Sequence, residues 1–186
     1  MEESFADVLT QGVPPQLMAV RLTLATVLGG LFGWEREARD KPAGLRTHML
    51  VSIGAATFTL LGFETGAALS DRFGDSGLDP TRIVQGIVGG LGFLGAGSII
   101  KSREAEDVRG LTTAASVWFT GALGVACGMG AYLLALISAG LGLLVLTVLG
   151  QVSKRPPSPG KPRTAAAAPR GAADEEVQSS SEHRAE

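Results

Sequence analysis

The sequence predicts an all-α membrane protein whose five transmembrane helices form one domain over residues 17–150. Five long apolar runs have their charged residues confined to the ends, as expected of membrane-spanning helices. Glycine accounts for 26 of 186 residues, about twice its usual share, whereas aromatic residues make up only 5%. This combination favours closely packed membrane helices over the main alternative, the buried helices of a soluble all-α protein.

A spanning helix needs about 20 mostly apolar residues, because the hydrocarbon core is about 30 Å thick and each residue rises about 1.5 Å. The predicted spans, in chain order, are 17–34, 48–69, 82–100, 112–129 and 131–150. The last two are joined only by Gly128-Met129-Gly130 and the adjacent residues. This junction predicts either a tight helical hairpin or one long bent helix.

The basic residues predict the orientation, because lysine and arginine accumulate in loops on the cytoplasmic side. Alternate connections are basic: Arg36, Arg39, Lys41 and Arg46 in the first, Lys101, Arg103 and Arg109 in the third, and Lys154 and Arg155 after the last span. We therefore expect residues 1–16 outside and the C-terminus in the cytoplasm. Residues 1–16 carry no lysine or arginine, unlike a signal peptide. Residues 151–186 are rich in proline, serine and charge, which predicts a disordered tail.

Charge and cysteine content exclude other classes of protein. The formal net charge of −2 and the scattered basic residues argue against a nucleic-acid partner. Cys127 is the only cysteine, so an internal disulfide and a cysteine-clustered zinc site are excluded. No nucleophile–base arrangement is visible, and we expect neither an enzyme nor a cofactor.

The first four spans resemble two copies of one hairpin, although chance similarity between glycine-rich helices is the alternative. Each copy returns to the membrane through Gly-Leu-x-Thr, at Gly44–Thr47 and at Gly110–Thr113. We expect a threonine hydroxyl to cap each helix start, with Arg46 and Arg109 alongside. Such helix ends either bind an external anion or pair with the loop acids Glu35, Glu37, Glu104 and Glu106.

The glycine positions predict close approach of helices, since small residues spaced four apart let backbones meet. The residues are Gly29 and Gly33 in the first span and Gly86, Gly90, Gly92, Gly95 and Gly97 in the third. The alternative is a broken helix whose free carbonyls coordinate a cation. The letters G-x-G-x-x-G at Gly90–Gly95 lie inside a span, so they do not indicate a dinucleotide site.

Two ionisable residues lie inside apolar spans, where an isolated charge is costly. Arg21 and Glu64 are each about one turn from the outer end of neighbouring antiparallel spans. We expect an Arg21–Glu64 ion pair, or else two side chains that reach the interface separately.

Several motifs together resemble the MgtC/SapB family of bacterial inner-membrane proteins. The matching stretches are Gly33–Glu37, Ala43–His48, Asp79–Arg82, Gly92–Gly97 and Arg109–Ala115 with Trp118. The resemblance implies a five-helix inner-membrane domain, adaptation to low magnesium, a link to virulence, an old label of magnesium transport, and restraint of ATP synthase. The soluble ACT-like domain of longer members has no counterpart in this sequence, so a role of that domain is not expected here.

Two functions follow: a non-enzymatic regulator that binds a membrane-protein partner or a second copy, and a component of a transporter for a cation such as Mg²⁺. Mg²⁺ prefers one or two carboxylates, and no span carries one near its midpoint, which favours the regulator. No metal site is assigned. The candidate functional residues are Glu35, Arg36, Glu37, Arg46, Thr47, His48, Asp79, Arg82, Arg109, Thr112, Thr113 and Trp118.

Overall fold

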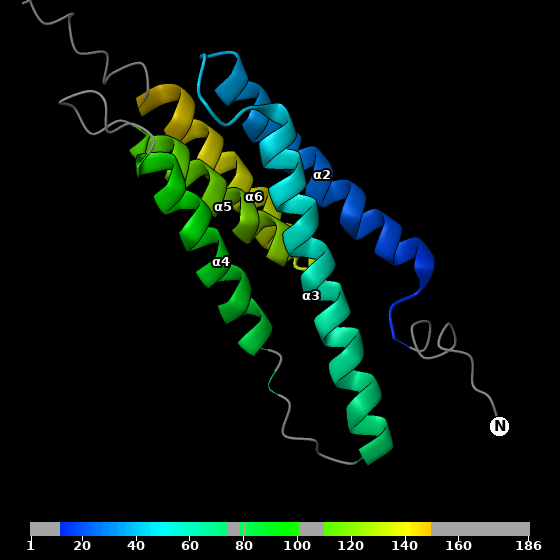
Figure 1. The fold of residues 1–186 in the computed structure, drawn as a ribbon. Coiled ribbons are helices and arrows are strands. Elements are labelled where there is room, and N and C mark those ends of the chain that lie inside the picture. The colour runs from blue at the N-terminus through cyan, green and yellow to red at the C-terminus, as the bar shows by residue number, and fades with distance from the viewer. Residues whose placement is uncertain (1–11, 74–78, 80, 101–109, 150–186) are drawn as a thin grey trace, which may run out of the picture. The chain divides into compact units, whose positions relative to one another are not determined.

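The structure, a computed structural model, describes residues 12–73, 79, 81–100 and 110–149. These residues form α2 (Pro15–Glu37), α3 (Leu45–Phe73), α4 (Thr81–Ile100), α5 (Leu111–Gly128) and α6 (Tyr132–Leu144), and a π-helical turn, η1 (Val145–Leu149), continues α6 (Figure 1). Within the described chain, five helices are long and apolar enough to cross a membrane, the last of them α6 with η1. The predicted all-α fold with five membrane helices is confirmed. Residues 1–11, the predicted tail at 151–186, and Glu104, Glu106 and Arg109 lie outside the described residues.

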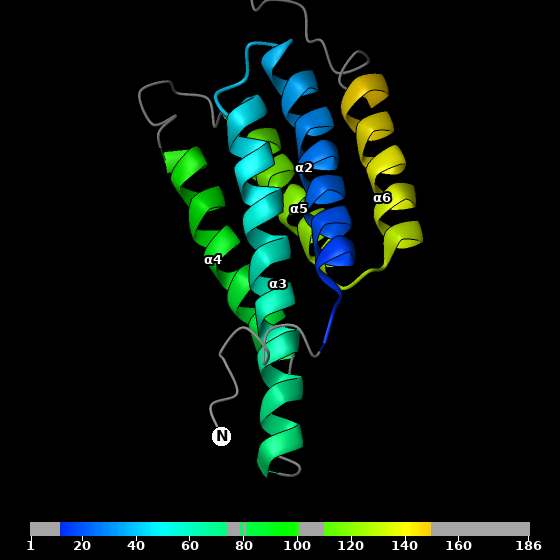
Figure 2. The same cartoon turned by 90° about the vertical axis from the view of Figure 1, so that its right-hand side faces the viewer.

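Three helices form the centre of the domain. α2 and α5 both pack against α3 and also contact each other, whereas α4 and α6 pack mainly against α5 (Figure 2). The buried cluster at this centre combines larger side chains, including Leu28, Phe32 and Leu123, with small ones such as Ala56 and Cys127. Small side chains at the crossings let the helix backbones approach closely, which maximises van der Waals contact in lipid.

The turn between α5 and α6 is a tight hairpin, so a single bent helix at this point is excluded. The backbone N–H of Met129 donates to Val125 O at 2.9 Å, and that of Gly130 donates to Cys127 O at 3.0 Å. Gly130 has φ +79°, a left-handed conformation that glycine adopts without steric cost.

α2 and α5 both place glycines against the α3 backbone. A Cβ added at Gly29 would lie 2.7 Å from His48 O, and one added at Gly33 would lie 2.5 Å from the Leu45 Cα. On the α5 side, a Cβ at Gly128 would lie 2.8 Å from Ala56 O, and one at Gly124 would overlap Ser52 O. The close approach expected at Gly29 and Gly33 is present, and the sequence analysis missed its counterpart on α5.

The glycines of α4 differ from the sequence expectation. No described atom lies within 4 Å of a Cβ added at Gly86, Gly90, Gly92 or Gly97, and Gly95 makes only an ordinary contact, 3.7 Å from the Ala114 Cβ. The reason is that most of these glycines do not lie on the face of α4 that contacts α5. Its contact is made by a larger residue, Leu91, which is buried and fills the space above Gly121.

The expected Arg21–Glu64 ion pair is absent among the described residues. Arg21 instead donates through Nη1 to the Gly128 carbonyl oxygen at 2.8 Å, at the C-terminal end of α5. The buried carboxylate of Glu64 accepts the Val13 N–H at 2.8 Å, just before α2 begins. The cationic Arg21 therefore binds the negative C-terminal end of α5, and the anionic Glu64 binds a backbone amide near the positive N-terminal end of α2, so neither side chain needs the other as a partner.

Candidate functional site

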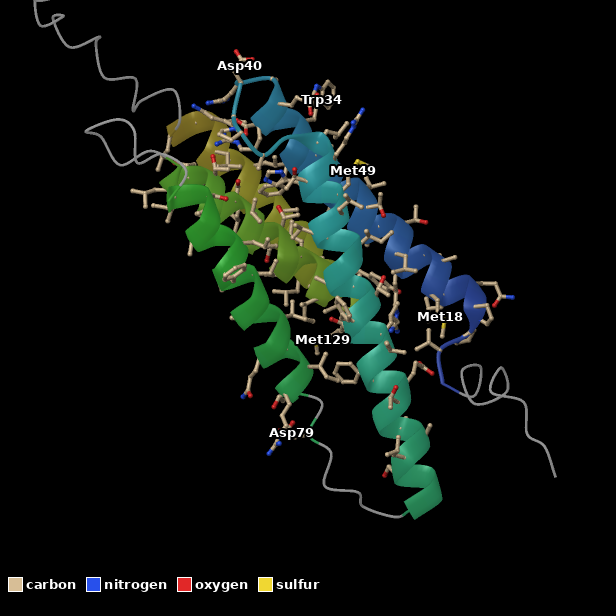
Figure 3. All side chains as sticks on the ribbon, viewed as in Figure 1. Met18, Trp34, Asp40, Met49, Asp79 and Met129 are labelled. Atoms are coloured by element: carbon tan, nitrogen blue, oxygen red, sulfur yellow. The ribbon has the colours of Figure 1, made fainter. Side chains whose placement is uncertain are left out.

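The candidate residues fall into two groups at opposite ends of the helices (Figure 3). One group lies where α2 ends and α3 and α5 begin, near the labelled Trp34 and Asp40. The other, Asp79 and Arg82, lies at the start of α4. The residues that the sequence singled out therefore do not make one site.

Glu35 is held by two arginines in the last turn of α2 and the residues after it. Arg36, which is only 3% exposed, donates to Glu35 through Nε and through Nη2, the latter at 2.8 Å. Glu35 Oε1, which accepts from Arg36 Nη2, also lies 2.6 Å from Arg39 Nε, and Arg39 Nη2 donates to Thr147 O at 3.3 Å. The cluster ties the end of α2 to the end of the fifth span, and the shared carboxylate satisfies charges that would be costly to bury alone.

Glu37 caps α3, a role that the sequence analysis gave to Thr47. The Leu45 N–H donates to Glu37 Oε2 at 2.8 Å, and Leu45 is the first residue of the helix. A carboxylate at a helix N-terminus satisfies an unpaired amide and interacts favourably with the helix dipole. Thr47 is instead an exposed residue within the first turn. The sequence left two partners open for this helix end, an external anion or an acidic residue of the loops. The structure contains the second, through Glu37.

His48 connects α3 to α5 at full burial. Its Nδ1 lies 2.9 Å from Gly44 O and its Nε2 lies 3.1 Å from the Ser116 Oγ. A carbonyl oxygen can only accept, so Nδ1 carries the proton in the neutral ring and Nε2 accepts the Ser116 hydroxyl proton. The Ser116 Oγ also lies 2.9 Å from Thr113 O, which gives the same proton a second acceptor. The sequence predicts a helix start at His48, but it carries no signal for Ser116 as the partner of this side chain.

Among the residues that the structure describes, none caps the start of α5 through its side chain. Gly110 precedes the helix with φ +93°, a conformation suited to glycine, and makes no capping contact through a side chain. Thr113 is buried, whereas Thr112 and Trp118 are exposed. The threonine cap expected here is therefore absent, because the position before the helix is Gly110, which has no side-chain oxygen, and Thr112 and Thr113 lie inside the helix.

At the other end, Asp79 caps the start of α4. Its Oδ1 accepts the Thr81 N–H at 2.9 Å, and its backbone oxygen accepts the Arg82 N–H at 3.1 Å. Hydrogen bonds from the Thr81 hydroxyl and amide lower the pKa of the Asp79 carboxyl below its ordinary value, with a smaller contribution from the charge of Arg82. Asp79 is therefore an anion at neutral pH, next to an exposed arginine side chain.

The buried polar groups of the first cluster mostly bind one another, which makes it a rigid connection between helices rather than an open reaction centre. In the described ranges, no three histidine, cysteine, aspartate or glutamate side chains converge as a metal site would require. Around the cluster, Lys41, Arg46, Thr47 and Thr112 are exposed. These side chains are available to a partner.

The buried face of α5, of which only Thr113 was a candidate from the sequence, has a recognisable sequence signal. Small residues recur along α5 three or four positions apart, at Thr113, Ser116, Thr120, Gly124 and Cys127, and all of them are buried. This spacing puts them on one helix face. The pattern identifies the α5 face that meets α3, and it was overlooked because the glycines of α4 are more numerous.

Comparison with known proteins assigns the chain to a family. The model of the MgtC family matches residues 22–155. The chain is 42% identical over 136 residues to "Putative magnesium transporter YhiD" of Escherichia coli K12, covering 73% of this chain and 62% of that protein. It is 49% identical over 112 residues to "Protein MgtC" of Brucella abortus, covering 60% of this chain and 42% of that protein.

A third relative, "Protein MgtC" of Salmonella typhimurium, is 42% identical over 136 residues, which cover 73% of this chain and 54% of the relative. The chain thus spans about half the length of these curated relatives. No solved structure matches it. The family match covers most of the five-helix domain and includes both groups of candidate residues, and we conclude that this protein is a multi-pass membrane protein of the MgtC family.

Proposed function

We propose that this protein is a non-enzymatic regulator in magnesium homeostasis, acting in the bacterial inner membrane by binding another membrane protein. The printed names of the relatives, which include a putative magnesium transporter, support the link to magnesium. The tight packing of α2, α3 and α5 is the observation that carries the regulatory role.

That packing leaves little freedom for an opening movement through the centre. At Gly29, Gly124 and Gly128, even one added methyl group would press against the α3 backbone. The polar side chains Thr59 and Thr120 donate to carbonyl oxygens one turn earlier in their own helices, at 2.7 and 2.8 Å. A core packed in this way is suited to a rigid scaffold whose outer surfaces bind a partner.

The outer face of α4 is the surface on which we expect a partner helix. Gly89, Gly92 and Ala96 follow one another at spacings of three and four residues, which places them on one face. All three are exposed, and the neighbouring Phe93 side chain is 81% exposed. A stripe of small residues beside a large aromatic ring allows a second helix to approach closely and to pack around the ring.

Photo-cross-linking in native membranes tests the regulator. A photoreactive amino acid at Phe93 should capture a discrete membrane protein, and ATP synthase, the partner implied by the family resemblance, is the first candidate to look for. The matched control is the same amino acid at Leu134 on α6, which is also exposed in the membrane. Equal, diffuse labelling from both positions would contradict a dedicated partner surface on α4.

The second candidate function is a component of a magnesium transporter, which the name of the E. coli relative favours. Liposomes that contain only this protein and a Mg²⁺-sensitive dye separate the two functions. The regulator predicts no Mg²⁺ entry above that of protein-free liposomes. Entry that rises with the amount of protein would establish transport and contradict our proposal.

The expected orientation, with the N-terminus outside, is tested with single cysteines. Cys127 is fully buried and can be replaced by alanine to give a cysteine-free background. A membrane-impermeant maleimide should then label Asp79→Cys in intact cells, and Lys41→Cys only after the membrane is opened. The reverse pattern would place the N-terminus in the cytoplasm.

A further inference from the structure

An open apolar groove separates α3 from α4 in the membrane-spanning region. It has a volume of about 600 Å³, and its walls include Phe58 on α3 and Ile83 on α4. Three glycines line it, Gly54, Gly86 and Gly90, and no described atom lies within 4 Å of a Cβ added at any of them. The absence of side chains at these positions keeps the groove open.

The groove continues toward the end of the membrane where α4 begins. A second hollow of about 380 Å³ shares Phe58 and Ile83 with the first and is also lined by Asp79 and Arg82. The two together form a path that is apolar along its length and carries one anionic and one cationic side chain at its end. An amphiphile with a long apolar chain and a zwitterionic head matches this order of surfaces.

We propose that the groove binds a phospholipid with a phosphate-plus-amine headgroup, its acyl chain between α3 and α4 and its head at Asp79 and Arg82. Arg82 pairs with the phosphate, because guanidinium groups bind phosphate oxygens through charge-assisted hydrogen bonds. Asp79 pairs with the ammonium group. The carboxylate would repel a purely anionic headgroup, so charge complementarity at this end favours phosphatidylethanolamine over phosphatidylglycerol.

The charges at its end favour a lipid over a helix as the occupant of the groove. A phosphate-plus-amine headgroup supplies one partner for Arg82 and one for Asp79, whereas the apolar side chains of a membrane-spanning helix supply neither. A single hydrocarbon chain also reaches the floor of the groove, where Gly54, Gly86 and Gly90 present no side chain.

Native mass spectrometry of the full chain tests the site. The protein is taken from nanodiscs that contain phosphatidylethanolamine and phosphatidylglycerol in equal amounts. We expect one retained phosphatidylethanolamine per chain, at least threefold in excess of phosphatidylglycerol. Gly90→Leu, which fills the groove, should remove most of the adduct. Gly92→Leu adds the same side chain to another face of α4 and should retain it.

The headgroup variants give the expected charge pattern. Asp79→Asn should abolish the preference for phosphatidylethanolamine while lipid is still retained, and Arg82→Gln should weaken the retention of both lipids. An acyl-chain diazirine on phosphatidylethanolamine should cross-link to Phe58 or Ile87 in the wild type, and not in Gly90→Leu. Thermal unfolding followed by circular dichroism confirms that each variant is folded.

Two outcomes would overturn the proposal. Equal lipid retention by folded Gly90→Leu and Gly92→Leu would show that the bound lipid lies elsewhere. A dimer that retains no lipid and that dissociates only in Gly90→Leu would show that a second copy fills the groove. Either result leaves the Phe93 cross-linking test of the regulator unaffected, because that residue lies on the other exposed face of α4.

Discussion

Two neighbouring glycine-rich helices, α4 and α5, use their small residues in opposite ways. In α5 the glycines lie directly against other helices, and 61% of the span is buried inside the protein. In α4 only 11% is buried, and most of the glycines have no described neighbour. The comparison teaches that small-residue spacing identifies a face capable of close approach, while the rest of the fold decides whether that face meets another helix.

The largest expected effect comes from adding a side chain to α5. Gly124→Ala places a methyl group against Ser52 O and Ala55, so the helices must separate. Overpacking of this kind costs about 1–3 kcal/mol, and Gly124→Leu should prevent stable folding altogether. The measurement is unfolding of the purified protein in detergent by titration with sodium dodecyl sulfate.

The matched variant on α4 is Gly90→Ala, which adds a methyl group in open space. We expect a change of less than about 1 kcal/mol, with stabilisation favoured because alanine restricts the unfolded chain more than glycine does. If Gly90→Ala destabilised the isolated protein as much as Gly124→Ala, the distinction between the two helices would be wrong.

The second effect concerns the polar contact that fixes the N-terminal end of α5. His48→Ala removes both ring hydrogen bonds and leaves Gly44 O and the Ser116 hydroxyl without this partner. Gly44 O still accepts the backbone N–H of residue 48, and the Ser116 hydroxyl still donates to Thr113 O, so neither group is left unsatisfied. An interhelical hydrogen bond in a membrane protein contributes about 0.6 kcal/mol on average, and removal of a buried side chain adds the cost of a cavity. We expect a loss of about 1–2 kcal/mol for His48→Ala and a smaller loss for Ser116→Ala.

A double-mutant cycle in the same unfolding assay checks the His48–Ser116 contact. The combined variant should cost less than the sum of the two single variants, because Ser116 is already without its histidine partner in His48→Ala. Additive losses would mean that the two side chains stabilise the protein separately.

The fold could be predicted from sequence because apolar length and charge placement depend only on the membrane. The expected spans 17–34 and 48–69 lie within α2 and α3, and the short connection around Gly130 forms the expected hairpin. Contacts within the domain were harder to predict. The partners of Arg21, Glu64 and His48 are backbone groups or a serine on another helix, and backbone groups carry no sequence signal.

The same limit explains the incorrect helix caps. A threonine just before a helix is a common cap, and the span predicted from residue 48 made Thr47 the expected cap of α3. The helix begins earlier, at Leu45, so Thr47 lies inside it. Glu37, the residue that supplies the cap, lies eight positions before Leu45. Its role depends on the path of the loop between the helices, which local sequence rules do not describe.

A third, smaller effect tests the other end of α5. Arg21→Gln removes the cation that binds Gly128 O at the helix C-terminus, where positive charge is favourable. We expect a loss of about 1 kcal/mol in the detergent unfolding assay. A double-mutant cycle with Glu64→Gln should be additive, because the two side chains bind different helix ends. A strong coupling energy between the two substitutions would instead support the direct Arg21–Glu64 ion pair that the sequence predicted.

The smallest effect should occur at the exposed start of α4, where Asp79 caps a helix that has few contacts of its own. The hydrogen bonds from Thr81 lower the pKa of the Asp79 carboxyl, so they stabilise the folded protein most when this group is ionised. That contribution is fully present above the ordinary carboxyl pKa of about 4 and is lost as the pH falls through the lowered value. The wild type should therefore be slightly more stable than Asp79→Asn at pH 7, and the difference should shrink as the pH falls below about 4.

Thermal unfolding of the two proteins between pH 3 and pH 7 measures this difference in stability. Thr57→Ala, which changes another exposed residue and no ionisable group, is the control. A difference between wild type and Asp79→Asn that stays constant down to pH 3 would mean that the charge of Asp79 makes no contribution at this helix end.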